Sequence, residues 1–319
     1  MKLNKTIAFI ILGISIFGMV FFSRTITPVK ADTLADIKAA GVLVVGSDTT
    51  YPPFEEYNTT TQETTGFDVD IAQQIGIALG VKVQFKTSEW VPIIPNLNNK
   101  QFDIIISAMT ITADRETQVD FSRWYYKSFQ GILVAKDNPM GFTQIDDLNA
   151  TGVKVGLQAG TTSDLYFNES LTLAERNAYS SLPLAIQALK SNIVDAVIGD
   201  YAVLAQDAAQ SGETKLLDKL FSPEDFGIAV RTGDTALLNE INGVLNDLLG
   251  SDVNNPNPSD LYNIIYNKWF LADAPDYTGT VSTGDIPVAS GAATPGFELI
   301  ALTPLLFIPL IRKIRKNRN

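Results

Sequence analysis

The chain of 319 residues contains no cysteine and no histidine. Without cysteine it can form no disulfide bond, no thiolate metal site and no thiol nucleophile, and it has no cysteine to carry a lipid anchor. Without histidine it lacks the imidazole metal ligand and the general base of Ser/His and Cys/His catalytic pairs. We therefore expect no metal and no cofactor, and the composition disfavours most hydrolase mechanisms.

Positive charge is scarce in the body of the chain. Nine of the 24 Lys and Arg residues lie in the two terminal segments, and residues 32–295 hold 15 Lys and Arg against 34 Asp and Glu, a net charge of −19. An acidic surface repels the phosphates of nucleic acids and anionic membrane surfaces. No nucleic-acid partner is therefore expected.

The first 31 residues have the pattern of an export signal. Lys2 and Lys5 precede an apolar run over residues 7–22, and Val29-Lys30-Ala31 presents small residues for cleavage after Ala31. The run is slightly short for a membrane span. Residues 1–31 are thus predicted to be a signal peptide, with an uncleaved membrane anchor as the alternative; either one exports the body.

The other end of the chain divides into a Thr/Ser/Gly/Pro-rich stretch, residues 273–294, and a tail, residues 295–319. The stretch predicts a flexible stalk. The tail holds Pro295-Gly296-Phe297, a short apolar segment and a basic cluster, and the segment falls short of the roughly 20 residues of a spanning helix. It resembles archaeal C-terminal sorting signals built around Pro-Gly-Phe, which a processing enzyme replaces with a lipid. The resemblance implies anchoring of the C-terminus at the extracellular face of the cell membrane; a simple C-terminal membrane anchor is the alternative.

The body alternates predicted strands and helices in two similar sets. The first set has strands at 42–46, 81–86 and 102–107 and helices at 66–79 and 91–100. The second set has strands at 153–157 and 196–199, a helix from 164 and a helix at 182–191. After it come a strand at 226–231 and helices at 235–249 and 261–269. The apolar run 102–107 suits a parallel strand buried on both faces. Folds of this class bind ligands in a crevice at the ends of their strands.

The predicted fold class is α/β, with two Rossmann-like lobes joined by a two-strand hinge. The first lobe is expected to be discontinuous, residues 32–127 and 226–272, and the second to span residues 128–225. The two hinge segments are predicted at residues 125–129 and 224–228.

Several segments of the body match one known family. They are VGSDTTYPPF at 45–54, GFDVD at 66–70, SEW at 88–90, IPNL at 94–97, FDIIISAMTIT at 102–112, Arg115, VDFS at 119–122, VGLQAGTTS at 155–163 and DAVIGD at 195–200. Over residues 33–272, in order, the chain resembles the periplasmic-type solute-binding proteins of polar amino-acid ABC importers (type II periplasmic-binding-protein fold, family 3). The resemblance implies a protein that captures an amino acid and presents it to permease subunits.

The resemblance also implies which residues hold the two charged groups of an amino acid. Arg115 matches the arginine that grips the α-carboxylate with two parallel hydrogen bonds, assisted by Thr110 and the backbone of Ala108. Thr161 and Thr162, near the start of a helix, offer amides and hydroxyls to the same carboxylate. Asp200 takes the ammonium group.

Four further positions are predicted to meet the ligand's side chain. Tyr51 and Trp90 match the two aromatic residues that sandwich it, and Asp48 matches a position that meets its polar end. Gln158 lies in a region that varies with the ligand.

Each of these residues also has a structural interpretation. Arg115 could pair with Glu116 or Asp120 on the surface, Trp90 could lie in the core, and Asp48 or Asp200 could be a turn residue at a strand end. Pattern alone does not separate surface ion pairs from functional ones.

The sequence as a whole predicts a monomeric cell-surface protein that binds a polar or cationic amino acid by hinge closure, delivers it to an ABC importer and catalyses no reaction. Two alternatives stay open: an exported cyclohexadienyl or arogenate dehydratase on the same fold, and a sensory module that presents its ligand to a receptor. Asn58, Asn149 and Asn168 begin Asn-x-Ser/Thr triplets that could carry glycans.

Overall fold

The computed structural model describes residues 33–270. The predicted signal peptide, stalk and sorting signal lie outside these residues. Between Thr33 and Phe270, no helix combines the length and the apolar character that a membrane crossing requires.

A single curled sheet runs through the described chain in the strand order β5-β1-β6-β12-β7-β10-β8-β9, with β11 paired to β7. Its strands are β1 (Val42–Ser47), β5 (Lys82–Thr87), β6 (Ile104–Ile105), β7 (Val119–Ala135), β8 (Lys154–Gln158), β9 (Glu175–Tyr179), β10 (Ala196–Asp200), β11 (Thr214–Leu216) and β12 (Phe221–Arg231). Parallel pairs β5-β1-β6 and β10-β8-β9 form its two ends. A small antiparallel sheet of β2 (Thr50–Tyr51), β3 (Glu55–Asn58) and β4 (Glu63–Thr65) follows β1.

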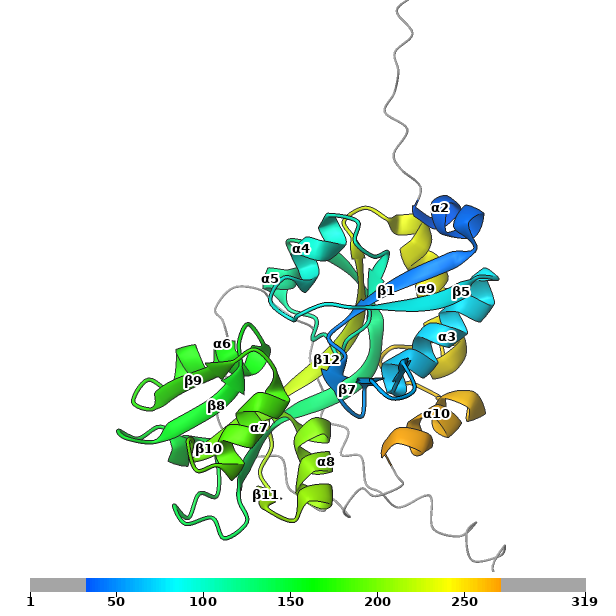
Figure 1. Ribbon diagram of the computed structural model, residues 1–319. Helices are drawn as coiled ribbons and strands as arrows, with labels where there is room; N and C mark the ends of the chain where they lie inside the picture. The colour runs from blue at the N-terminus through cyan, green and yellow to red at the C-terminus, as the bar shows by residue number, and fades with distance from the viewer. Residues whose placement is uncertain (1–32, 271–319) are drawn as a thin grey trace, which may run out of the picture. The chain divides into compact units, whose positions relative to one another are not determined.

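Helices cover the sheet in two groups (Figure 1). They are α2 (Thr33–Ala40), α3 (Phe67–Leu79), α4 (Ile93–Asn98), α5 (Ala113–Glu116), α6 (Thr162–Ser170), α7 (Leu182–Lys190), α8 (Tyr201–Ser211), α9 (Thr235–Leu249) and α10 (Asp260–Phe270), with a 3-10 turn, η1 (Ile145–Leu148). Helices α2, α3, α4, α9 and α10 lie around β1, β5 and β6, whereas α6, α7 and α8 lie around β8 and β10. The two groups are the two lobes, so the predicted fold class is confirmed.

The first-lobe sheet is buried on both faces, as its apolar run predicts. Ile104 and Ile106 pack in the same apolar cluster as α3 and α9, while Ile105 between them packs with α4. Successive strand residues point to opposite faces of a sheet, so helices must cover both sides here. The ladder itself is shorter than expected: β6 keeps only Ile104–Ile105 of the predicted strand 102–107.

Strands β7 and β12 join the lobes. Each is long, and they pair with each other antiparallel while β12 also pairs with β6 and β7 with β10 (Figure 1). The register shifts on both sides of Gly227, where an added Cβ would lie 2.8 Å from Ile111 Cγ1. The shift between Phe226 and Gly227 lies inside the predicted hinge segment 224–228. Residues 224–226 of this segment pair with residues 126–128 of the other predicted segment.

Helix prediction succeeded better than strand prediction. Helix α9 has the expected bounds, and α3 ends as expected at Gly80, which adopts a left-handed conformation with φ 70°. Strand β9, helix α8 and the small sheet were not predicted.

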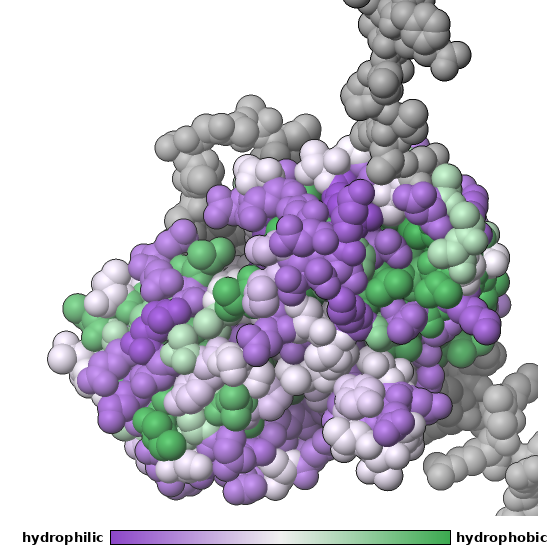
Figure 2. Space-filling model, turned by 45° about the horizontal axis from the view of Figure 1, so that its top comes forward, coloured by the Kyte–Doolittle hydropathy of each residue, from purple (hydrophilic) through white to green (hydrophobic). Residues whose placement is uncertain are grey.

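Figure 2 shows hydrophilic surface between the apolar areas on one face of the molecule.

The two glycines that flank α3 supply a stability test. Gly66 has φ 148°, and a Cβ there would lie 1.9 Å from the Phe54 carbonyl oxygen, whereas a Cβ at Gly80 would meet nothing within 4 Å. Gly66→Ala should therefore lower the free energy of unfolding by about 3 kcal/mol or more, and Gly80→Ala by about 1 kcal/mol, in urea denaturation. Equal losses for the two variants would contradict this account of the tight approach at Gly66.

Candidate functional site

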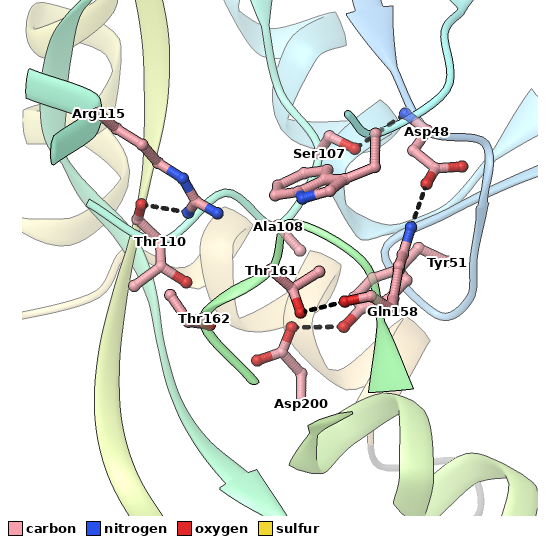
Figure 3. Close-up of a pocket in the computed structure, with 11 residues that line it drawn as sticks. Asp48, Tyr51, Ser107, Ala108, Thr110, Arg115, Gln158, Thr161, Thr162 and Asp200 are labelled. Carbon is pink, nitrogen blue, oxygen red and sulfur yellow. Dashed lines mark hydrogen bonds between the residues drawn. The ribbon is translucent and has the colours of Figure 1, made fainter. Parts of the chain in front are cut away.

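A cavity lies between the lobes (Figure 3). Its lining residues are Asp48, Tyr51, Trp90, Ser107, Ala108, Thr110, Arg115, Gln158, Thr161, Thr162 and Asp200. The structure thus brings all ten predicted site residues together around one cavity, and it adds Ser107.

Within residues 33–270, Arg115 is a buried cation without an anionic partner. Thr112 caps the short helix α5, accepting a hydrogen bond from the Arg115 amide at 3.3 Å, and Arg115 Nη1 donates to the Thr110 carbonyl at 2.7 Å. Only 8% of the residue is exposed, and in the described chain no carboxylate lies within 4.0 Å of its guanidinium. Burial lowers the pKa of Arg115, opposed by the charges of Glu224 and Asp200. The predicted alternative of a surface pair with Glu116 or Asp120 is excluded.

Trp90 forms one wall beside this cation. The Arg115 guanidinium carbon lies 5.1 Å from the centroid of the Trp90 ring, and Trp90 Nε1 donates to the Gly160 carbonyl at 2.9 Å. The ring also packs against the apolar cluster around α4. Trp90 therefore packs against the apolar core and also lines the cavity.

Asp200 lies where β10 ends and α8 begins, on the second-lobe side of the cavity. Its carboxyl group accepts hydrogen bonds from the Tyr51 hydroxyl at 2.5 Å and from Gln130 Nε2 at 2.7 Å. Burial, and then the charge of Glu224, raise the pKa of Asp200 well above its usual range. Burial also raises the pKa of Tyr51, so this phenol remains a donor.

Asp48 lies at the end of β1, facing the second lobe. Its carboxylate accepts hydrogen bonds from Thr50 Oγ1 and from Gln158 Nε2, both at 2.8 Å, and burial raises its pKa. The Gln158–Asp48, Tyr51–Asp200 and Trp90–Gly160 bonds all cross the cavity, from one lobe to the other. The structure therefore describes a closed arrangement of the two lobes.

Thr161 and Thr162 lie at the start of α6, where backbone amides are free to bind an anion. The Thr161 hydroxyl donates to the Gln158 carbonyl at 2.8 Å and accepts from the Asp164 amide at 3.4 Å. Asp164 in turn accepts from the Gly160 amide at 2.8 Å, and Arg176 neutralises it through two bonds of 2.6 and 2.7 Å. These contacts hold the loop between β8 and α6 in place.

Two buried carboxyl groups beneath the site were not predicted to be part of it. Asp68 lies in the first turn of α3, where it is fully buried and accepts from the Ala108 amide and the Tyr125 hydroxyl, both at 2.8 Å. It thereby fixes Ala108, whose φ is 44°. Glu55 accepts from Ser107 Oγ at 2.5 Å, and the Ser107 oxygen accepts from the Asp48 amide at 2.9 Å. Their partners lie 40 or more residues away, so no local pattern could have revealed these contacts.

Comparison with known proteins identifies the family. Residues 43–272 match the family of bacterial extracellular solute-binding proteins, family 3. The chain belongs to this family. It is 35% identical over 247 residues to the ABC transporter glutamine-binding protein GlnH of Bacillus subtilis, covering 76% of this chain and 86% of that protein. It is also 33% identical over 237 residues to a probable histidine-binding protein of Neisseria gonorrhoeae, covering 72% and 83%.

Solved structures agree with this membership. The ancestral amino acid-binding protein AncCDT-1, described as a precursor of cyclohexadienyl dehydratase, is 38% identical with a TM-score of 0.68, covering 75% of this chain and all of that one. A mutant of ArgBP from T. maritima is 34% identical with a TM-score of 0.68, covering 75% and 99%. The family predicted from the sequence is therefore confirmed.

The buried carboxyl group of Asp68 predicts a pH dependence of stability. Burial raises its pKa to about 7, so the stability it contributes is present at low pH and is lost as the pH rises through about 7. In Asp68→Asn the amide oxygen can still accept from Ala108 and Tyr125, and the residue no longer ionises. Thermal unfolding of the variant should therefore depend less on pH in this window than that of the parent protein.

Asp70→Asn is the matched control, two residues along the same helix, where the carboxylate is partly exposed and accepts from Lys268 and Trp269. It should keep the parent protein's pH dependence. A full pH dependence in Asp68→Asn would contradict the assignment.

Proposed function

We propose that the chain captures a polar or cationic amino acid between its lobes and delivers it, chemically unchanged, to an ABC importer. The observation that carries the proposal is the buried guanidinium of Arg115, which lines the cavity with no carboxylate partner in residues 33–270. Burying an unpaired charge is costly, and a ligand carboxylate would remove that cost.

A zwitterion fits the two walls of the cavity. Its α-carboxylate would take paired hydrogen bonds from Arg115 and further ones from the amides of Thr161 and Thr162 at the start of α6. Its ammonium group would lie against Asp200. Thr110 and Ala108, which adjoin Arg115 in the cavity wall, support the carboxylate end.

The remaining lining residues favour a polar or cationic ligand side chain. Tyr51 and Trp90 provide aromatic surface, and Asp48 and Gln158 provide a hydrogen-bonded polar end. Among the eleven lining residues Arg115 is the one basic residue, so the second carboxylate of an acidic amino acid would lack a cation. Relatives named for binding glutamine, histidine, arginine and cystine support this class.

Closure about β7 and β12 is the proposed mechanism, with lobes at residues 32–127 plus 226–272 and 128–225. The ligand would make its full set of contacts only when the lobes meet, because Arg115 and Asp200 belong to different lobes. Its differential affinity would then shift the population toward the closed state. The closed body would dock on permease subunits as a monomer. Residues 1–31 would direct its export, and residues 295–319 would anchor it at the membrane. Docking, export and anchoring are proposed from the sequence.

Arg115 supplies the direct test. A thermal-shift screen first selects the amino acid that stabilises the purified chain most. Calorimetry with that amino acid should then show that Arg115→Ala weakens binding by about 100-fold or more, because the ligand carboxylate loses its buried partner. Arg115→Lys should also bind weakly, since an ammonium group cannot form the paired bonds. Unchanged melting temperatures without ligand would show that both variants fold.

Glu116→Gln is the matched control: it changes an exposed charge on the adjacent residue and should bind like the parent protein. Full affinity in Arg115→Ala would overturn the site assignment. Conversion of prephenate or arogenate to product would favour the dehydratase alternative over transport.

A further inference from the structure

The hairpin between β3 and β4 carries a motif that amino-acid capture does not use. β3 ends at Asn58, residues 59–62 form the turn, and β4 begins at Glu63. Asn58-Thr59-Thr60 is one of three Asn-x-Ser/Thr triplets in residues 33–270, the pattern in which an asparagine of an exported protein accepts a glycan. All residues from 56 to 63 are exposed, and none of them lines the cavity. The motif therefore lies on open surface, apart from the site.

The turn leaves the Asn58 amide nitrogen free to react. Asn58 Oδ1 accepts hydrogen bonds from the backbone amides of Thr60 at 2.8 Å and Thr61 at 3.1 Å, which is an Asx turn. This turn brings the third residue of the triplet beside the asparagine. Within residues 33–270, Asn58 Nδ2 itself donates to no acceptor. Two donors on Oδ1 also draw electron density from Nδ2, so its protons are easier to remove.

The triplet that begins at Asn149 is less available. Asn149 is half-buried at the end of the 3-10 turn η1, and its Oδ1 accepts from the Leu173 amide at 2.9 Å. That bond joins the triplet to the segment that follows α6. A modifying enzyme would have to break this tertiary contact to draw the Asn149 amide into its own site.

The triplet that begins at Asn168 lies within helix α6. Asn168 Nδ2 donates to Asp164 Oδ1 at 3.2 Å, one helical turn earlier. Residues two apart on a helix do not face each other, so one enzyme cannot engage the Asn168 amide and the Ser170 hydroxyl together. Unwinding α6 would also disturb Thr161 and Thr162, which line the cavity at its start. The folded chain therefore presents one of its three described triplets for modification.

We propose that Asn58 is the glycan acceptor of the folded chain and that Asn149 and Asn168 stay unmodified. The inference requires export of the chain, which residues 1–31 predict. It does not depend on which ligand the cavity holds.

The sugar donor would be an oligosaccharide linked to a lipid phosphate and presented by a membrane-bound transferase. Asn58 Nδ2 forms a bond to the anomeric carbon of the first sugar, and the bond from that carbon to the phosphate oxygen breaks. The lipid phosphate leaves with the electron pair of the broken bond. One proton of the amide passes to a base of the transferase, and nothing is oxidised or reduced.

A glycan at Asn58 would leave the cleft open to ligand. Tyr51, which lines the cavity, pairs with Glu55 at one end of β3, whereas Asn58 lies at the other end and pairs with Glu63. The three residues from Glu55 to Asn58 span about 10 Å of strand. The modified side chain would therefore lie outside the cavity, and amino-acid binding should not change with its loss.

Peptide mass spectrometry of the chain purified from the cells that make it is the direct measurement. Trypsin cuts after Lys and Arg, so the three triplets fall in separate peptides, residues 39–82, 137–154 and 155–176. We expect peptide 39–82 to carry the added mass of a glycan, with fragments that place it on Asn58. The other two peptides should have their unmodified masses.

Variants made in the same cells identify the acceptor. Asn58→Gln and Thr60→Ala should lose the glycan, because they change the asparagine and the hydroxyl of the triplet. Thr60→Ser keeps a hydroxyl group and should stay modified. Thr59→Ala, at the middle position of the same triplet, is the matched control and should be modified like the parent protein. All four variants should bind amino acids as the parent protein does, since the hairpin does not line the cavity.

An unmodified peptide 39–82 would overturn the inference. A glycan on Asn149 or Asn168 would also overturn it, because the fold would then not select the acceptor. Either result leaves the proposed function intact, since amino-acid capture is tested separately through Arg115.

Discussion

The site depends on one electrostatic constraint: a guanidinium is buried in a strongly acidic chain, and no carboxylate of the described residues is bonded to it. The body of the protein has 34 acidic residues for 15 basic ones, yet the Arg115 side chain meets a backbone carbonyl and an indole ring rather than an ion-pair partner. Such a cation is stable only if an anion joins it or if nearby negative charge compensates at a distance. Glu224 and Asp200 favour the charged form of this guanidinium from a distance. Arg115 also lines the cavity, where the carboxylate of a ligand would meet it.

The fold makes this arrangement conditional on closure. Arg115 belongs to the first lobe and Asp200 to the second, and the lobes are joined by β7 and β12, which pair with each other and shift register near Gly227. In the closed arrangement, polar side chains on opposite walls form hydrogen bonds across the cavity: Tyr51 donates to Asp200, and Gln158 donates to Asp48. A ligand must therefore offer hydrogen bonds at least as good as those it displaces, which favours a compact zwitterion over an apolar molecule.

Much of the fold, and the residues that line the cavity, could be predicted from the sequence, because local signals encode them. Hydrophobic periodicity located α9, a glycine stop located the end of α3, and the family motifs located ten of the eleven residues around the cavity. The buried carboxyl groups behind the cavity escaped prediction for a physical reason. Glu224 meets Thr110 across 114 positions and Asp68 meets Ala108 across 40, so only the folded chain reveals their partners. The length of β6 was also predicted wrongly. It depends on which residues pair with neighbouring strands, and the apolar pattern of residues 102–107 does not show this.

In the proposed site, the cleft recognises a carboxylate and an ammonium group held at one fixed separation. The most direct measurement of this recognition compares the tightest-binding amino acid with two analogues, one without the α-carboxylate and one without the α-ammonium group, in calorimetry with the purified chain. We expect each analogue to bind about 100-fold or more weakly than the parent amino acid, because each leaves a buried charge unpaired. An analogue lacking the carboxylate that bound as tightly as the amino acid would contradict it.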